Sequence, residues 1–156
     1  MLSLRRACKH VIAWRDADEG ASAVEFGIIA PVLAAVLVPL IDLGLAFYQQ
    51  MQVDDAAQAG AQYAMAHGWN TSAIQSAVTG ATALATVSAT PAPARSCGCP
   101  SGTAVAAADC GSTCDDGQSA RTYVTVSAQA TYTTLIPYPT IGNSVVLSAQ
   151  STVRVQ

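Results

Sequence analysis

Four cysteines in the second half of the chain are the residues whose types and spacing best suit chemistry. Cys97 and Cys99 form a C-x-C pair, and Cys110 and Cys114 form a C-x3-C pair a short distance further on. Thiols at these spacings can form two disulfides, or they can hold a structural zinc ion together. A redox-active dithiol is disfavoured, because there is no C-x-x-C motif and Arg95 is the one basic residue that adjoins the four.

Other arrangements of catalytic residues are missing from the sequence. It has no phosphate-binding loop and no Ser-His-acid or Cys-His set. The acidic pairs, Asp54 with Asp55 and Asp115 with Asp116, are interpreted as solvated surface charges. His67 has no cysteine or acid at a metal-ligand spacing, so we interpret it as a capping or surface residue. The sequence therefore predicts neither an enzyme nor a cofactor.

A carboxylate stands at the start of a hydrophobic run. Gly20 is followed after four residues by Glu25 and Phe26, and the sixteen residues that begin with Phe26 carry no charge. The apolar character resumes after Asp42, and the whole run of about 23 residues, at roughly 1.5 Å rise per residue, can cross a ~30 Å hydrocarbon core. We therefore expect a membrane-spanning helix. Asp42, near its far end, could be a solvated acid or a buried contact with a partner.

Charges are distributed unevenly around this apolar run. Four of the seven basic residues precede it, whereas acidic residues lie near or beyond its far end. By the positive-inside rule, the amino terminus is cytoplasmic and the rest of the chain is exported. In an oxidising compartment, disulfides from Cys97 and Cys99 to Cys110 and Cys114 are favoured over a zinc site, with the order of pairing left open. Because 11% of the residues are charged and the net charge is −3, a basic nucleic-acid binder is excluded.

The leader and the apolar run carry a resemblance to a known family. A basic leader that ends in Gly20, followed by four residues and then Glu25 and Phe26, resembles the G-x-x-x-x-E-[FY] processing motif of type IV prepilins. The continuation, with its IDLG and AFY blocks and the Ala-rich AAQAGAQYA, resembles the TadE-like minor pseudopilins of tight-adherence (Tad/Flp) pili. The resemblance covers about residues 18–68 strongly and the carboxyl-terminal strands weakly.

This resemblance implies that a prepilin peptidase cuts between Gly20 and Ala21. Glu25 would then be the fifth residue of the mature chain, where it could compensate the new ammonium of its own chain or of a neighbour. Glu25, Phe26 and Asp42 are the residues that the resemblance implies for assembly. The alternative for Glu25 is an interfacial carboxylate in the headgroup region with no partner. An ordinary signal-peptidase cut is not expected, because no A-x-A sequence follows the apolar run.

Beyond the membrane the sequence favours two helices. The first continues from the span through Ala66, because residues 48–66 contain no proline and Gly68 is well suited to end a helix. A second helix is expected from a cap among residues 70–72 to about Ala85. A stripe of small residues on the first helix could pack against another subunit or against the chain's own exported domain. The stripe comprises Val53, Ala57, Gly60, Ala61 and Ala64.

Strands are predicted only in the last third of the chain. Residues 88–117 are interpreted as a loop, since they combine Pro, Gly, Ser and four cysteines with little apolar period. Alternation with a period of two predicts half-buried strands at 123–132 and 145–155, which we expect to be antiparallel neighbours joined by a loop. The predicted fold class is α+β and pilin-like. It has a long membrane-spanning helix that continues into a small exported domain with a second helix, a disulfide loop and an antiparallel hairpin or small sheet.

The sequence thus predicts a basic prepilin leader (1–20), a transmembrane helix (21–50) and an exported pilin-like domain (51–156). We expect a minor pseudopilin that is needed for pilus assembly, and so for surface adhesion and biofilm formation. The resemblance implies four partners: the prepilin peptidase, other pilins and pseudopilins of the Tad system, the inner-membrane assembly platform and the lipid bilayer.

The expected location is the inner membrane, crossed once, with a periplasmic carboxyl-terminal domain; incorporation into an extracellular pilus is left open. The alternative is an uncleaved, signal-anchored periplasmic binding or adhesive module. It would share every feature of the sequence except removal of the leader.

Overall fold

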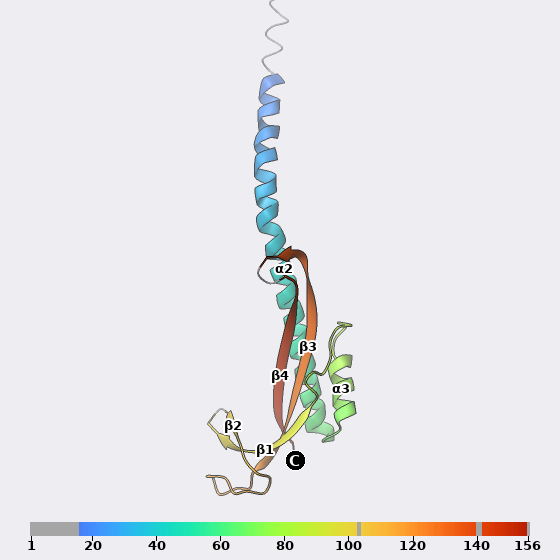
Figure 1. Ribbon diagram of the computed structural model, residues 1–156, viewed down its shortest axis with the longest axis vertical. Coiled ribbons are helices and arrows are strands. Elements are labelled where there is room, and N and C mark those ends of the chain that lie inside the picture. Colours follow the sequence, from blue (N-terminus) through green and yellow to red (C-terminus); the bar gives the residue numbers. More distant parts are fainter. Residues whose placement is uncertain (1–15, 103, 140–141, 156) are drawn as a thin grey trace, which may run out of the picture. The chain divides into compact units, whose positions relative to one another are not determined.

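The computed structural model describes residues 16–102, 104–139 and 142–155 (Figure 1). The basic part of the predicted leader, residues 1–15, lies outside the described residues. The chain divides into two compact units, one that ends at Asp42 and one that begins at Leu43. The described elements are helices and strands of the predicted α+β class.

The first element is a helix of 52 residues, α2 (Asp16–His67). It passes through Pro31 and Pro39 without interruption. Each of these prolines removes one backbone hydrogen bond, which a membrane helix tolerates when neighbouring groups satisfy the freed carbonyl. Among the described residues, this is the one helix long and apolar enough to cross a membrane. The prediction of a long apolar helix is therefore confirmed.

The end of α2 follows the prediction closely. The helix stops at His67, and Gly68 adopts a left-handed backbone with φ of 79°. The amide of Gly68 donates to the carbonyl of Ala64 at 2.9 Å, which satisfies one of the last free carbonyls of the helix. A residue with a Cβ would be strained at Gly68, so this glycine fixes where the helix ends.

The second helix, α3 (Thr71–Gly80), is shorter than predicted. It begins as expected, because the Asn70 side chain accepts a hydrogen bond from the amide of Ala73 at 3.1 Å. The predicted end at about Ala85 is wrong. The hydroxyl of Thr82 accepts from the amide of Leu84 at 3.1 Å and donates to the side chain of Gln52 on α2 at 2.7 Å. The hydrogen bonds of Thr82, one to a nearby amide and one to α2, replace the helical pattern after Gly80.

Four antiparallel strands form one sheet, in the order β2-β1-β3-β4. They are β1 (Ala94–Ser101), β2 (Ala104–Ala107), β3 (Arg121–Tyr138) and β4 (Gly142–Val155). The antiparallel pairing of the last two strands confirms the prediction, but both are longer than expected. A register shift between Thr133 and Tyr138 lets β3 continue through residues that the sequence assigned to a loop.

The interpretation of residues 88–117 as a loop is partly wrong, because β1 and β2 lie there. β1 pairs with β3, from Ala94 opposite Thr125 to Gly98 opposite Arg121. Only Gly98 is buried in β1, and every residue of β2 is exposed. Strands with so little burial show no apolar alternation, which explains why periodicity could not find them.

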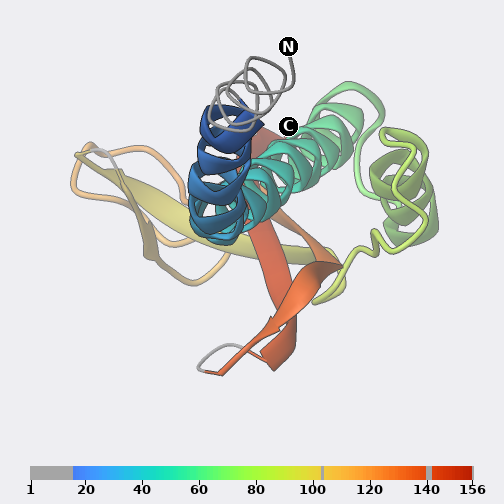
Figure 2. The same ribbon diagram turned by 90° about the horizontal axis from the view of Figure 1, so that it is seen from above.

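The small-residue stripe of α2 packs on the chain's own domain. Val53, Ala57, Ala61 and Ala64 are at most 1% exposed, and Gly60 is buried with them. They form the core with residues of α3 and β3, namely Ile74, Val78, Val124 and Val126. Figure 2 shows α3 beside the carboxyl-terminal half of α2. Of the two alternatives for this stripe, the structure therefore supports packing within the chain.

Gly60 is the closest point of this packing. A Cβ placed on Gly60 would lie 2.5 Å from Cγ2 of Val78 and 2.8 Å from Cγ1 of Val126. Distances below 3.0 Å require neighbouring atoms to move. We expect Gly60→Ala to destabilise the compact unit that begins at Leu43 by roughly 1–3 kcal/mol through overpacking, despite the better helix propensity of Ala.

The measurement is guanidinium unfolding of the full chain in detergent micelles, followed by the fluorescence of Trp69 after Trp14→Phe. Gly80→Ala is the matched control, because a Cβ at Gly80 meets nothing within 4 Å. Its unfolding midpoint should equal or exceed that of the parent. Equal midpoints for Gly60→Ala and Gly80→Ala would contradict the tight contact.

Candidate functional site

The predicted cleavage and assembly residues lie at the exposed beginning of α2. Gly20 is exposed, and a Cβ placed on it would meet nothing within 4 Å. Glu25 is also exposed, and the Phe26 side chain is 70% exposed. The described residues thus leave this segment open to a protease, to lipid or to other helices.

Helical geometry relates the predicted cut to Glu25. Ala21 and Glu25 are four residues apart in α2, and residues at this spacing are neighbours on one helix face. A helical side chain also leans toward the amino terminus of its helix, so the side chain of Glu25 covers the turn that begins near Ala21. A cut after Gly20 would therefore place the new ammonium on the same face as Glu25.

Asp42 has a different environment from Glu25. Its side chain is 3% exposed, whereas its neighbours Ile41 and Leu43 are each 54% exposed. Such burial argues against a solvated acid at the end of the span. The alternative, a contact between Asp42 and a pilus partner, stays a prediction.

The four cysteines form two disulfides, which confirms the preferred alternative and settles the order of pairing. Cys97 is bonded to Cys110 with their Cα atoms 5.1 Å apart, and Cys99 to Cys114 with their Cα atoms 5.5 Å apart. Cys97 and Cys99 are two apart on β1 and so point to the same side of the strand. No thiolate of the four is left for zinc, and the described residues include no group of His, Cys, Asp and Glu that could hold a metal ion.

Gly98, between two of these cysteines, is needed for the approach of β2 to β1. A Cβ at Gly98 would collide with the Val105 side chain and would lie 2.7 Å from the carbonyl oxygen of Ala106. The C-x-C motif therefore needs a glycine at its centre, because the backbone of β2 covers it on one side. This requirement arises from long-range pairing, which the motif alone does not reveal.

The loop after β2 is held by hydrogen bonds as well as by the disulfides. The amide of Cys114 donates to the carbonyl of Gln118 at 2.8 Å, and the amide of Gln118 donates to Asp116 at 2.9 Å. Asp116 also pairs with Arg121 at 3.3 Å. Because both side chains are partly exposed, this ion pair adds little stability. Asp116 is exposed, so this contact is compatible with the prediction of a solvated surface charge.

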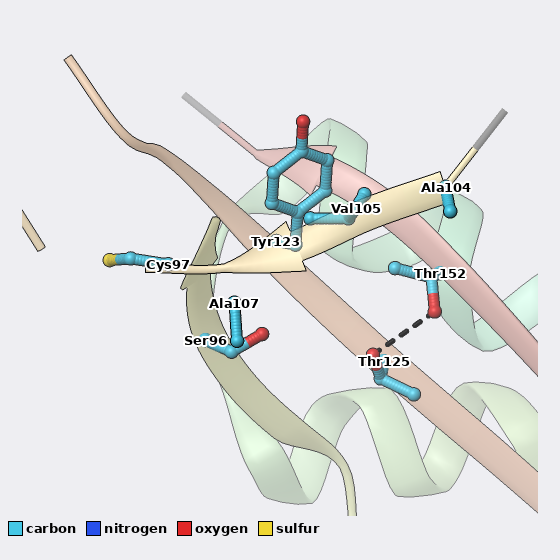
Figure 3. A pocket seen from close by; sticks show the side chains of 8 residues that line it. All are labelled: Ser96, Cys97, Ala104, Val105, Ala107, Tyr123, Thr125 and Thr152. Atoms are coloured by element: carbon cyan, nitrogen blue, oxygen red, sulfur yellow. Dashed lines mark hydrogen bonds between the residues drawn. The ribbon is translucent and has the colours of Figure 1, made fainter. Parts of the chain in front are cut away.

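A shallow pocket of about 440 Å³ lies on the sheet (Figure 3). The Tyr123 ring and Val105 line one part of it, and the hydroxyls of Thr125 and Thr152 lie 3.0 Å apart in another. The side chains that line the pocket include no carboxylate, imidazole or amine. Its surface offers the hydroxyls of Thr125 and Thr152 and the phenol of Tyr123.

His67 lies in the last turn of α2, where its ring stacks on Tyr63 with the ring centroids 4.5 Å apart. It is exposed, as predicted for a capping or surface residue. The guanidinium of Arg95 on β1 lies 5.9 Å from the ring centroid of Trp69, which follows the end of α2. This cation–π contact links β1 to the turn between the two helices.

Comparison with known proteins identifies one part of the chain. Residues 20–62 match the family model described as TadE-like protein, which confirms the resemblance predicted from the sequence. The matched segment begins at Gly20 and ends inside α2. No curated protein and no solved structure matches the chain significantly.

The observed pairing predicts which cysteines can be removed together. In a Cys8→Ser background, Cys97→Ser with Cys110→Ser should leave Cys99 and Cys114 bonded and no free thiol. Cys97→Ser with Cys114→Ser should leave two free thiols or mixed species. Thiol counting and mass analysis of the exported protein without reductant would measure this. The same thiol count for both double variants would contradict the pairing.

Proposed function

We propose that this chain, which is TadE-like over residues 20–62, is a minor pseudopilin of a tight-adherence (Tad/Flp) pilus. In this role it is needed for pilus assembly, and so for surface adhesion and biofilm formation. The observation that carries the proposal is the match of the family model to the apolar helix α2, since the matched segment begins at Gly20, where a prepilin cut is expected. The TadE-like family is associated with Tad pili and is not a family of enzymes.

Removal of the leader is the first step of the proposed role. A prepilin peptidase would cut between Gly20 and Ala21 at the cytoplasmic surface of the inner membrane. Gly20 supports this assignment, because it has no side chain to obstruct a protease and because glycine weakens a helix that must open for cleavage. The cut would remove the basic residues of the leader and leave a single ammonium beside the bilayer.

Glu25 is proposed to neutralise this ammonium. In the low dielectric beside lipid, an opposite charge one helical turn away is worth more than it is in water. The partner could belong to the same chain or to a neighbouring subunit, and the second case would set the register between helices. Other pilins, pseudopilins and the assembly platform of the inner membrane are the proposed partners. The exposed apolar surface of α2 supports this, because the described residues leave its large side chains largely uncovered.

Gly20→Arg tests the cut. We expect this variant to accumulate at the full length of the chain, because a long charged side chain beside the scissile bond obstructs the peptidase. A Cβ at position 20 meets nothing, so the described fold should not change. Immunoblotting and amino-terminal sequencing of the membrane-extracted protein would measure processing.

Gly27→Ala is the matched control for this experiment, since a Cβ at Gly27 is equally unhindered. It should be processed normally. A mature band of normal size from Gly20→Arg would contradict cleavage at this bond. Pili assembled from a parent chain that is never shortened would favour the uncleaved, signal-anchored module instead.

Glu25→Ala tests assembly separately from cleavage. We expect the leader to be removed but pili to be lost, because the new ammonium then has no carboxylate to meet. Glu25→Gln, which keeps the size of the side chain, should behave like Glu25→Ala if the charge matters. Asp55→Asn, at an exposed acid of the same helix, should assemble normally. Pilus counts by electron microscopy are the measurement, and unaltered piliation of Glu25→Ala would leave only the headgroup alternative.

A further inference from the structure

We propose that the closed end of the β3–β4 hairpin enters the headgroup region of the membrane that α2 spans, on its exported side. This hairpin end comprises the described residues 133–139 and 142–146. The exported domain would then contact lipid through the hairpin end as well as through α2. The inference rests on the membrane-spanning role of α2, and it does not depend on cleavage or on pilus assembly.

The position of the hairpin along α2 is the first observation. The Gln50 side chain donates to the carbonyl of Ser148 on β4 at 3.0 Å. Further along, Gln62 of α2 lies beside Val153, with which it lines one groove. The residue numbers of α2 and β4 therefore rise together, and the two elements run in the same direction.

The lengths of the two elements then place the hairpin end. From Ser148 back to Gly142, β4 extends about 20 Å at roughly 3.3 Å per residue. From Gln50 back to Leu43, α2 extends only about 10 Å at roughly 1.5 Å per residue. The hairpin end therefore reaches the level of Leu43, where this compact unit begins. Figure 1 shows the closed end of the hairpin level with the first turns of α2 in this unit.

The surface at this level is apolar on both elements. Within this unit, the first turns of α2 expose Leu43, Leu45, Phe47, Tyr48 and Met51, each by 42–62%. The hairpin end exposes Leu135 by 58%, Ile136 by 38% and Val146 by 64%. A soluble domain that exposed these groups to water would lose their burial energy, whereas lipid covers them. Within this unit, the apolar surface of the hairpin end is thus at the same level as the apolar surface of the first turns of α2.

The distribution of charge is a second and independent observation. From Thr122 to Val153 the chain contains no Asp, Glu, Lys or Arg, and Arg121 and Arg154 stand at the open end of the hairpin. Long exposed edge strands usually carry charges that keep them soluble, and β4 is such a strand. A charge that entered lipid would be unfavourable, most strongly at the centre of the bilayer and less so near its surface. The absence of charged residues from this part of the hairpin therefore makes contact with a bilayer possible.

Polar groups at the hairpin end limit its depth. Thr133, Thr134, Asn143 and Ser144 bring hydroxyl and amide groups that need water or headgroup partners. The headgroup and upper acyl region can supply such partners. A half-buried tyrosine, Tyr138, is also of the type enriched at this interface.

Fluorescence quenching by lipid tests the proposal on the full chain. The protein, with Trp14→Phe and Trp69→Phe, carries one new tryptophan and is reconstituted in phosphatidylcholine vesicles that contain a nitroxide-labelled lipid. Ile136→Trp reports on the hairpin end. Val105→Trp, on the equally exposed β2, is the matched control, and Val36→Trp in the apolar run is the positive reference.

We expect Ile136→Trp to lose roughly half of its fluorescence to the nitroxide lipid and little to aqueous iodide, since an interfacial group penetrates about 5–10 Å. Val105→Trp should show the reverse. If Ile136→Trp behaves like Val105→Trp while Val36→Trp is quenched by lipid, the hairpin contact is wrong and the membrane span stands. If Val36→Trp is not quenched by lipid either, the span itself is wrong and the hairpin contact falls with it. Protection of Ile136→Trp from both quenchers would show that a second copy covers it, which would also overturn the proposal.

Discussion

A backbone that crosses a lipid bilayer must satisfy its own N–H and C=O groups, and the rest of this structure depends on how α2 meets that constraint. The helix extends over 52 residues and continues past two prolines, each of which removes one backbone hydrogen bond. Its first part exposes large apolar side chains, which lipid can cover. Its second part buries Ala and Gly instead, which lets α3 and the sheet approach the helix backbone. The compact unit that begins at Leu43 is therefore built around the second part of the same helix.

The part of the sheet that packs on α2 buries many side chains, and the rest of the sheet buries few. β3 buries Val124, Val126, Ala128, Ala130 and Tyr132 against the helices. β1 and β2 bury almost nothing, so the hydrophobic effect does little to hold them. The two disulfides act in this region, and closing loops of this size contributes about 3 kcal/mol each in the chain-entropy model. Covalent bonds thus stabilise the part of the sheet that the core does not reach.

How much of this could be predicted from sequence depended on whether the signal was local. The alternation from Val124 to Tyr132, the cap at Asn70 and the end of α2 at Gly68 are set by nearby residues, and all three agree with the structure. β1 and β2 were missed because their pairing joins distant segments and leaves no apolar period. The role of Gly60 and the order of the disulfides were also beyond the sequence, since each depends on which elements meet in space. At the candidate site, the spacing of Gly20 and Glu25 could be recognised in the sequence, but the burial of Asp42 could not be predicted from it.

The exposed apolar surface of α2, which suits a lipid environment, also limits how the proposed subunit could join a fibre. Moving one exposed Leu, Ile or Phe side chain from lipid to water would cost about 1.5–3 kcal/mol, and the first unit exposes many of them. The proposed subunit could therefore leave the bilayer only as its helix entered a bundle of other apolar helices. In such a bundle a single acid among apolar groups is costly unless it meets a cation, so Glu25 would favour the one register that supplies an ammonium. Apolar surface would drive association without choosing a register, and the carboxylate would choose it.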